Sequence, residues 1–346
     1  MSKNIDISII IPLYNGKAYI KETVESLFGI RHSKEIIIVD DGSKDDSFNY
    51  CRELFSDCNF VKLYRKDNGG IVDTRNYGIS KVSGNYVMFC DQDDIVIPEA
   101  IDKALEKDDD CIIWSTQRLI DNDVIVPCDT VTNNAEAGIS EIRNILIPQM
   151  LTNRSSEFVS YMGHVWAGIF KRDIIDANSI GFKRFVDIED DYLFVFDFLC
   201  AAKKISFIKD AGYIWRFNRK SETFRVKYVD NMLERYGWFY DYLSERCNNL
   251  QIFDEDYNAY SVQDRTVMCI ENCFQYFNRN REEKRDIRKY YQANRQLFKS
   301  QSIEPYVKRR KRIFWFLSRN MFDIAVFYVF ADSIVRRIVS IFRQSS

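Results

Sequence analysis

The chain of 346 residues is poor in histidine and lacks several arrangements on which common kinds of site depend. His32 and His164 are its only histidines, so neither a zinc site of Cys and His ligands nor a histidine-centred triad is favoured. Its nine cysteines form no Cys-x-x-Cys pair and mostly lie in apolar surroundings, which predicts reduced core residues of a cytosolic protein. Carboxylates are therefore the side chains expected to carry the chemistry.

Glycine, proline and long apolar runs are scarce in the last third of the chain. From about residue 227 onward the sequence has one glycine, Gly237, and one proline, Pro305, which predicts a helical region. No apolar run there reaches the ~20 residues that a membrane-spanning helix needs. The whole chain is 46% hydrophobic and 15% aromatic, enough to bury one large α/β domain with an appendage, which we place at residues 1–225 and 226–346.

Four strand-like segments alternate with helix-like segments in the first hundred residues. The strand-like segments are 7–13, 35–39, 60–64 and 85–90, and each is followed by polar turn residues and then, in the first three cases, by an apolar stripe at helical spacing. This alternation predicts an α/β fold with a doubly wound, mostly parallel sheet. Ser43 is expected to cap the second helix.

Beyond this core the pattern is less regular. We expect further strands at 111–116 and 124–126, a loop over 127–138, an edge strand at 203–208 and a closing strand at 213–218.

The fourth strand ends in a cluster of carboxylates. Asp91 and Asp93 leave the apolar run almost together, so their mutual repulsion must be relieved by a cation or by protonation. Mg²⁺ prefers one or two carboxylates and takes its other ligands from water and phosphates, which suits a diphosphate leaving group. The alternative is a turn that is acidic without binding anything.

Polar residues also follow the other parallel strands, and the carboxyl ends of such strands meet at one edge of the sheet. The residues that should gather there are Tyr14 and Asn15, Asp40 and Asp41, Asn68 and Gly69, and Asp91 and Asp93. Arg75, on the helix after Asn68, can reach a phosphate or steady the carboxylates, and a surface salt bridge is an equal alternative.

Four motifs in this order resemble the family 2 glycosyltransferases of the GT-A fold. They are Ile10-Ile-Pro-Leu-Tyr-Asn15, Val39-Asp-Asp-Gly-Ser43, Asn68-Gly-Gly with Thr74-Arg-Asn-Tyr-Gly78, and Phe89-Cys-Asp-Gln-Asp-Asp94. The resemblance covers about two thirds of the chain and fades near Thr223. It implies a GT-A-like sheet and a nucleotide-sugar donor, but it does not identify the sugar.

The resemblance also implies roles for individual residues. Asp91 and Asp93 would hold Mg²⁺ or Mn²⁺ on the donor diphosphate. The implied donor-binding residues are Pro12, Tyr14, Asp40, Asp41, Asn68, Arg75 and Asp91. Gln92 departs from the family, where a small residue is common, so we expect a changed sugar contact with intact metal ligands.

Residues 158–171 resemble the segment that precedes the family's acceptor site. His164 and Trp166 are therefore candidates for contact with an acceptor sugar, with core packing as the alternative for both. Further on, Arg216 and Arg219 are candidates for neutralising phosphate, and surface basicity is the competing interpretation.

Three acids, Glu189, Asp190 and Asp191, open a predicted helix. Acids at a helix N-terminus stabilise it by about 0.3 to 1 kcal/mol each, which is one interpretation. The resemblance implies the other: Asp190 is the general base of an inverting transfer, or Asp191 if the register shifts by one residue.

The C-terminal tail, residues 308–346, differs from the rest in charge. It contains nine Arg or Lys and two acids, Asp323 and Asp332, which gives a net charge of +7. Because the whole chain has a net charge of −2, the rest of the chain has a net charge of −9. Its last turns are amphipathic by sequence, which predicts an interfacial anchor on an anionic membrane. A helix docked on the catalytic domain or on a second subunit is the alternative.

These observations predict an inverting, metal-dependent glycosyltransferase with a UDP-sugar donor and a glycan or lipid-linked saccharide acceptor. We expect a cytoplasmic protein at the inner face of the membrane, without a nucleic-acid partner. A sugar-nucleotide-forming nucleotidyltransferase is one rival, but Pro12-Leu-Tyr-Asn-Gly16 is not the glycine-rich phosphate loop it would need. A non-catalytic carbohydrate-binding protein is the other rival.

Overall fold

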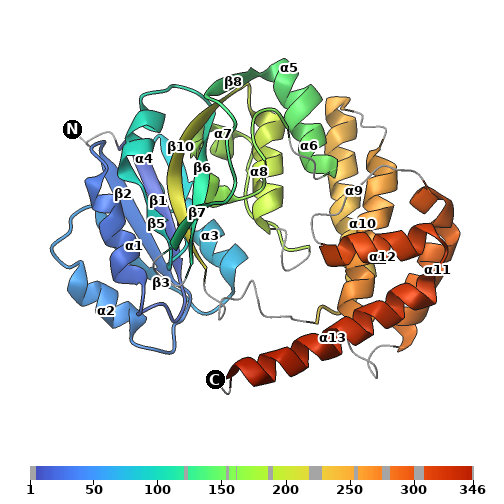
Figure 1. The fold of residues 1–346 in the computed structure, drawn as a ribbon. Coiled ribbons are helices and arrows are strands. Elements are labelled where there is room, and N and C mark those ends of the chain that lie inside the picture. The colour runs from blue at the N-terminus through green and yellow to red at the C-terminus, as the bar shows by residue number, and fades with distance from the viewer. Residues whose placement is uncertain are drawn as a thin grey trace. The chain divides into compact units, whose positions relative to one another are not determined.

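The computed structural model of the protein describes residues 5–120, 124–152, 156–160, 162–185, 190–217, 228–252, 256–274, 281–299 and 308–344. The chain divides into two compact units, one of residues 1–184 and 188–224, the other of residues 185–187 and 225–346. The first contains a sheet with helices, and the described part of the second contains only helices (Figure 1). Their separate catalytic and accessory roles stay a prediction.

The first unit is built on a ten-stranded sheet. Its strands are β1 (Ile7–Leu13), β2 (Lys34–Asp40), β3 (Val61–Arg65), β4 (Tyr86–Phe89), β5 (Ile95–Val96), β6 (Cys111–Ile120), β7 (Val124–Pro127), β8 (Ala135–Gly138), β9 (Gly168–Lys171) and β10 (Lys204–Phe217). They follow the order β3-β2-β1-β4-β9-β6-β10-β5, with β7 on β6 and β8 on β10. The longest ladders are parallel, whereas β9 runs antiparallel between β4 and β6. The predicted α/β fold is confirmed.

Helices cover both faces of this sheet. They are α1 (Ile20–Ser26), η1 (Leu27–Gly29), α2 (Ser47–Leu54), α3 (Ile71–Ile79), α4 (Pro98–Leu105), α5 (Ile139–Glu141), η2 (Ile142–Leu146), α6 (Ile147–Thr152), η3 (Val165–Ala167), α7 (Arg172–Ala177) and α8 (Asp190–Ala201). Ile9 and Ile11 of β1 join the core that includes α1, α2 and α4. Ile10 faces α3, so closely that a β-carbon on Gly78 would lie 2.5 Å from it. Burial on both faces explains the continuous apolar strands.

The expectation of two separate strands at 203–208 and 213–218 is wrong. They form one strand, β10, which pairs with β6 along its length and with β8 and β5 on its other side, so it is not an edge. Two register shifts between Ile208 and Tyr213 interrupt the alternation that sequence analysis relies on. Gly212 lies in this break, where a β-carbon would come within 2.6 Å of the Trp114 indole.

Two smaller expectations are also wrong. Ser43 does not cap α2, which begins at Ser47; the Ser43 hydroxyl instead accepts a hydrogen bond from the Asn15 N–H at 3.0 Å. The predicted loop over 127–138 ends in a strand, β8, because β10 offers it an unpaired side.

The second unit is a helical assembly, as predicted. It contains α9 (Met232–Leu250), α10 (Tyr257–Phe274), α11 (Arg281–Asn294), η5 (Arg295–Lys299), α12 (Lys308–Ser318) and α13 (Phe322–Gln344). Among the residues that the structure describes, no helix has the length and apolarity to cross a membrane. The tail forms α12 and α13, and α13 packs on α10 and α12 of its own unit.

Candidate functional site

The parallel strands β1, β2, β3 and β4 bring their polar end loops to one edge, as predicted. Leu13 of β1 pairs with Asp40 of β2, and Asp40 pairs with Arg65 of β3, so these three strands end level. The loop after β4 adjoins that of β1, since the Tyr14 N–H donates to the Gln92 amide oxygen at 2.8 Å.

Asp41 fastens the β2 loop to the turn that starts α3. Its carboxylate accepts the N–H of Gly69 at 2.9 Å, the N–H of Gly70 at 2.8 Å and the Lys66 ammonium at 2.6 Å. Gly70 has φ 87°, which favours glycine. The Asn68 amide donates to the Asp41 carbonyl at 2.9 Å. Asp41 therefore shapes this part of the edge, and its direct contact with a donor stays a prediction.

Asp40 lies beneath this loop and is fully buried. One carboxylate oxygen accepts from the Ser43 N–H and pairs with the Arg65 guanidinium, both at 3.2 Å. The other oxygen has no hydrogen-bond partner among the residues that the structure describes. A buried oxygen that accepts no hydrogen bond costs about 1 to 3 kcal/mol of folding free energy. Asp40 can therefore accept a further hydrogen bond from a donor group of a ligand.

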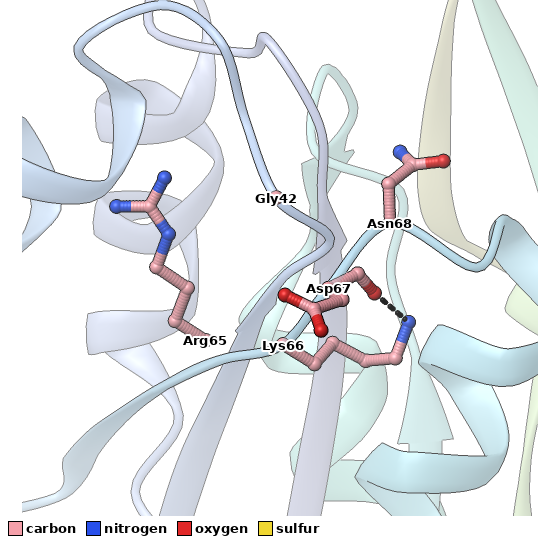
Figure 2. A pocket seen from close by; sticks show the side chains of 5 residues that line it. All are labelled: Gly42, Arg65, Lys66, Asp67 and Asn68. Carbon is pink, nitrogen blue, oxygen red and sulfur yellow. Dashed lines mark hydrogen bonds between the residues drawn. The ribbon is translucent and has the colours of Figure 1, made fainter.

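A polar hollow of about 580 Å³ opens between these loops. Figure 2 shows its lining residues, Gly42, Arg65, Lys66, Asp67 and Asn68, with Lys66 donating to the Asp67 carbonyl at 2.7 Å. Sequence reasoning named Asn68 but missed the two cations. Their position directly before the Asn68-Gly-Gly turn was the available signal.

Gln92 ties the β1 loop to the loop after β4. Its amide oxygen accepts the Tyr14 N–H at 2.8 Å, and its amide nitrogen donates to the Tyr14 carbonyl at 3.1 Å. The Tyr14 side chain is left exposed beside this clamp, whereas Pro12 is buried within β1. The expected effect of Gln92 on a sugar contact stays a prediction, because its amide is used inside the protein here.

Asp91, Asp93 and Asp94 form a tight acidic loop after β4. Burial and the neighbouring Asp91 raise the pKa of Asp93 to about 6, and burial holds the pKa of Asp94 well above its usual range. Like charges in one half-buried loop are stabilised by a cation. Among the described residues no group of three or more His, Cys, Asp or Glu is arranged so that it could hold a metal ion. The metal-binding role of Asp91 and Asp93 stays a prediction.

Tyr213 and Arg216 of β10 brace that loop from below. The Tyr213 hydroxyl donates to Asp94 at 2.7 Å and accepts the Asp91 N–H at 3.0 Å. The Arg216 N–H donates to Asp94 at 2.8 Å, and its guanidinium donates to the Asp93 carbonyl at 2.9 Å and to Glu22 at 2.7 Å. Arg216 is buried, so the surface interpretation is wrong for it. Arg219 lies outside the described residues.

Arg75 links the acidic loop to the start of α8. Its guanidinium pairs with Asp91 at 3.1 Å and with Asp191, and it stacks over the Phe182 ring at 5.1 Å from the centroid. Arg75 is buried, so the surface salt bridge is wrong. Its contacts with two carboxylates agree instead with the predicted role of stabilising them. Asp190 begins α8, but its side chain lies outside the description.

A stack of three rings leads away from the acidic loop. His164 stacks on Trp166 with centroids 4.4 Å apart, and Trp166 stacks on Tyr213 at 4.8 Å. Trp166 is 6% exposed, which fits the core-packing alternative, whereas His164 at the end of the stack is half-buried, and burial lowers its pKa to about 4. The His164 imidazole lies 3.3 Å from the Asp129 carboxylate, whose pKa burial raises to about 6. Contact of His164 or Trp166 with an acceptor stays a prediction.

The family model "Glycosyl transferase family 2" matches residues 8–176. The chain is 25% identical over 303 residues to the uncharacterized glycosyltransferase EpsJ of Bacillus subtilis, covering 82% of each chain. It is 27% identical to the minor teichoic acid biosynthesis protein GgaB of the same organism, over 62% of this chain and 23% of that one.

The fold is similar to that of residues 1–349 of TarS from S. aureus, solved in complex with UDP-GlcNAc. The TM-score is 0.64 and the identity 19%, over 94% of this chain and 90% of that one.

Proposed function

Since this chain is a family 2 glycosyltransferase, we propose that it is an inverting, metal-dependent enzyme that transfers a sugar from a UDP-linked donor to an acceptor hydroxyl. The observation that carries the proposal is Arg75, which joins Asp91 of the acidic loop to Asp191 beside the proposed base. The Arg75 guanidinium, held between these two carboxylates, would set the separation of donor and base. The acidic pair alone would fit any metal site.

Mg²⁺ or Mn²⁺ held by Asp91 and Asp93 would stabilise the charge that develops on the leaving diphosphate. The Asp40 oxygen that accepts no hydrogen bond is suited to a hydrogen-bond donor of a nucleotide. The hollow beside Asn68 and Lys66 is suited to its phosphates. In support of a UDP-sugar, TarS carries UDP-GlcNAc in its complex.

Asp190 is the residue that we propose to take the proton from the acceptor hydroxyl. Asp191 is already paired with Arg75, so it is better suited to orient that guanidinium than to accept a proton. His164, at the end of the ring stack, is proposed to contact the acceptor, with Trp166 supporting it from behind. General bases of this kind contribute about 10² to 10⁴ in rate.

The acceptor is proposed to be a glycan or lipid-linked saccharide of a surface polysaccharide. The similarity to a protein named for teichoic acid biosynthesis supports this class. The tail, with a net charge of +7, is proposed to hold the enzyme on the inner, anionic face of the membrane where such an acceptor would lie.

Slow hydrolysis of the donor tests the reaction class without knowledge of the acceptor. A panel of nucleotide sugars is incubated with the protein and Mn²⁺, and again with a chelator. Release of nucleoside diphosphate that needs the metal and is lost in Asp93→Ala supports the proposal. Formation of a UDP-sugar from UTP and a sugar phosphate, with pyrophosphate released, would identify a nucleotidyltransferase instead.

A further inference from the structure

Helix α13 packs on its neighbours with one face and shows an apolar face to the outside. Phe322, Ala325, Val329 and Ser333 are buried, at spacings of three and four residues. Contacts with α10 and α12 account for this inner face. The tail is thus docked within its own unit, an arrangement that the sequence did not predict, and its role as an interfacial anchor stays a proposal.

The opposite face, here called the outer stripe, consists of Ile324, Phe327, Ile334 and Val335. Their exposed fractions are 47%, 69%, 40% and 57%. Positions 324, 327, 334 and 335 fall within one arc of an α-helix of 3.6 residues per turn. Such a run of large apolar side chains on one exposed face indicates an interaction surface.

Basic and aromatic side chains lie at the corner where this helix begins. Arg319 stacks over the exposed Trp315 at 4.0 Å, in the turn that joins α12 to α13, and Arg312 lies over the Tyr328 ring at 5.9 Å. Asp323, the exposed acid at the margin of the stripe, is neutralised by Arg288. Tryptophan and arginine beside an apolar face are typical of the headgroup region of a bilayer.

We propose that the outer stripe lies in the interface of an anionic lipid bilayer, with Arg312 and Arg319 at the headgroups. The inference rests on the proposed membrane association and names the surface that produces it. A symmetric contact with a second copy is less suited to the stripe, because a two-fold axis there would bring two tails of charge +7 together. An anionic surface instead complements that charge.

The docking of α13 also decides how the surface must be tested. Ile313 and Leu317 of α12 and Ala325 and Val329 of α13 are at most 1% exposed. Removal of residues 308–346 would therefore strip the core of the second unit, and loss of binding after truncation would prove nothing. Single substitutions on the outer stripe leave that core intact.

The experiment sediments the full chain with vesicles of phosphatidylcholine alone or of phosphatidylcholine and phosphatidylglycerol in equal parts. We expect binding only to the second, weakened at high salt, and a drop of about tenfold or more in the partition coefficient for Phe327→Glu. Trp238→Glu is the matched control, since Trp238 is an exposed aromatic residue (50%) on α9. Arg319→Gln should weaken binding and its salt dependence.

Each outcome has one meaning once circular dichroism shows equal melting of the variants. Equal vesicle binding by Phe327→Glu and the wild type overturns the outer stripe while leaving membrane association standing. No binding of the wild type, with a dimer in sedimentation velocity that Phe327→Glu dissociates, shows that the stripe is a protein interface and overturns the inference. Donor hydrolysis is measured on the same samples; its absence refutes the proposed enzyme chemistry without touching the vesicle result.

Discussion

Partly buried charges are arranged differently in the two units. At the sheet edge, Asp91, Asp93 and Asp94 crowd like charges into one loop, and the pKa of Asp93 rises to about 6 as a result of burial and Asp91. In the helical unit, Arg310 pairs with Glu271 at 2.9 Å. Crowding of like charges does not stabilise a fold, whereas pairing can.

This difference in charge arrangement is what we use to tell the proposed site, the acidic loop, from the helical unit. Asp264, also in the helical unit, is half-buried, and burial raises its pKa, but it accepts a hydrogen bond from the Tyr240 hydroxyl at 2.7 Å, and both this bond and the nearby Arg310 act to lower that pKa. A perturbed pKa alone would have marked both regions. Only the acidic loop combines it with mutual repulsion at the carboxyl edge of a parallel sheet.

The largest effect on activity is expected at the proposed base. Asp190→Asn should lower sugar transfer by about 10² to 10⁴, with nucleotide affinity within a few-fold of the wild type, because the base acts only on the acceptor. Transfer is followed by product release and affinity by calorimetry. A larger loss in Asp191→Asn than in Asp190→Asn would place the base one residue later.

Asp93→Ala should weaken metal-dependent binding of a nucleoside diphosphate by about a hundredfold, since one of the two proposed metal ligands is lost. Calorimetry with and without Mn²⁺ measures this effect. If affinity in the presence of Mn²⁺ is unchanged, the acidic loop is not the metal site.

Tyr213→Phe should lower transfer by about tenfold, because Asp94 loses a donor and the Asp91 N–H loses its acceptor. The apparent affinity for Mn²⁺ should fall with it. Tyr86→Phe is the control: its hydroxyl donates to the Asp109 carbonyl at 2.9 Å, away from the acidic loop. An equal effect of both substitutions on transfer would reduce Tyr213 to a general stability role.

Metal-dependent donor binding should also weaken as the pH falls through about 6. The pKa of Asp93 is raised to about 6, so its carboxylate is protonated below that pH and no longer attracts a cation. We expect about a tenfold loss of Mn²⁺-dependent affinity per pH unit below 6, measured with a UDP-sugar, whose diphosphate does not titrate in this range. Asp93→Asn should bind weakly with no such pH dependence.

The smallest effect is expected in the helical unit, and it should be one of stability alone. Arg310→Met removes the ion pair with Glu271 and should cost about 1 to 2 kcal/mol of unfolding free energy, with donor hydrolysis unchanged. Urea unfolding compares it with Arg312→Met, an exposed residue whose loss should matter by less than about 0.5 kcal/mol. A loss of hydrolysis in folded Arg310→Met would mean that the paired charges also serve the site.

Local sequence determined the first four strands and the residues at their ends. Strands 7–13, 35–39, 60–64 and 85–90 lie within one or two residues of β1 to β4, because a strand buried on both faces is a continuous apolar run that polar turns interrupt. The convergence of Asp40, Asn68 and Asp91 followed from parallel topology, which needs no side-chain detail.

The residues that support the sheet edge from β10, α3 and α8 could be identified only from the tertiary structure. Tyr213 and Arg216 reach the acidic loop from more than a hundred residues away, through a strand whose register shifts break its period. The partners of Arg75 depended on α8 coming to face α3, and the exposed face of α13 depended on which side α10 and α12 covered. Contacts between residues distant in the chain leave no periodic signal in either segment alone, whereas strands and their end loops do.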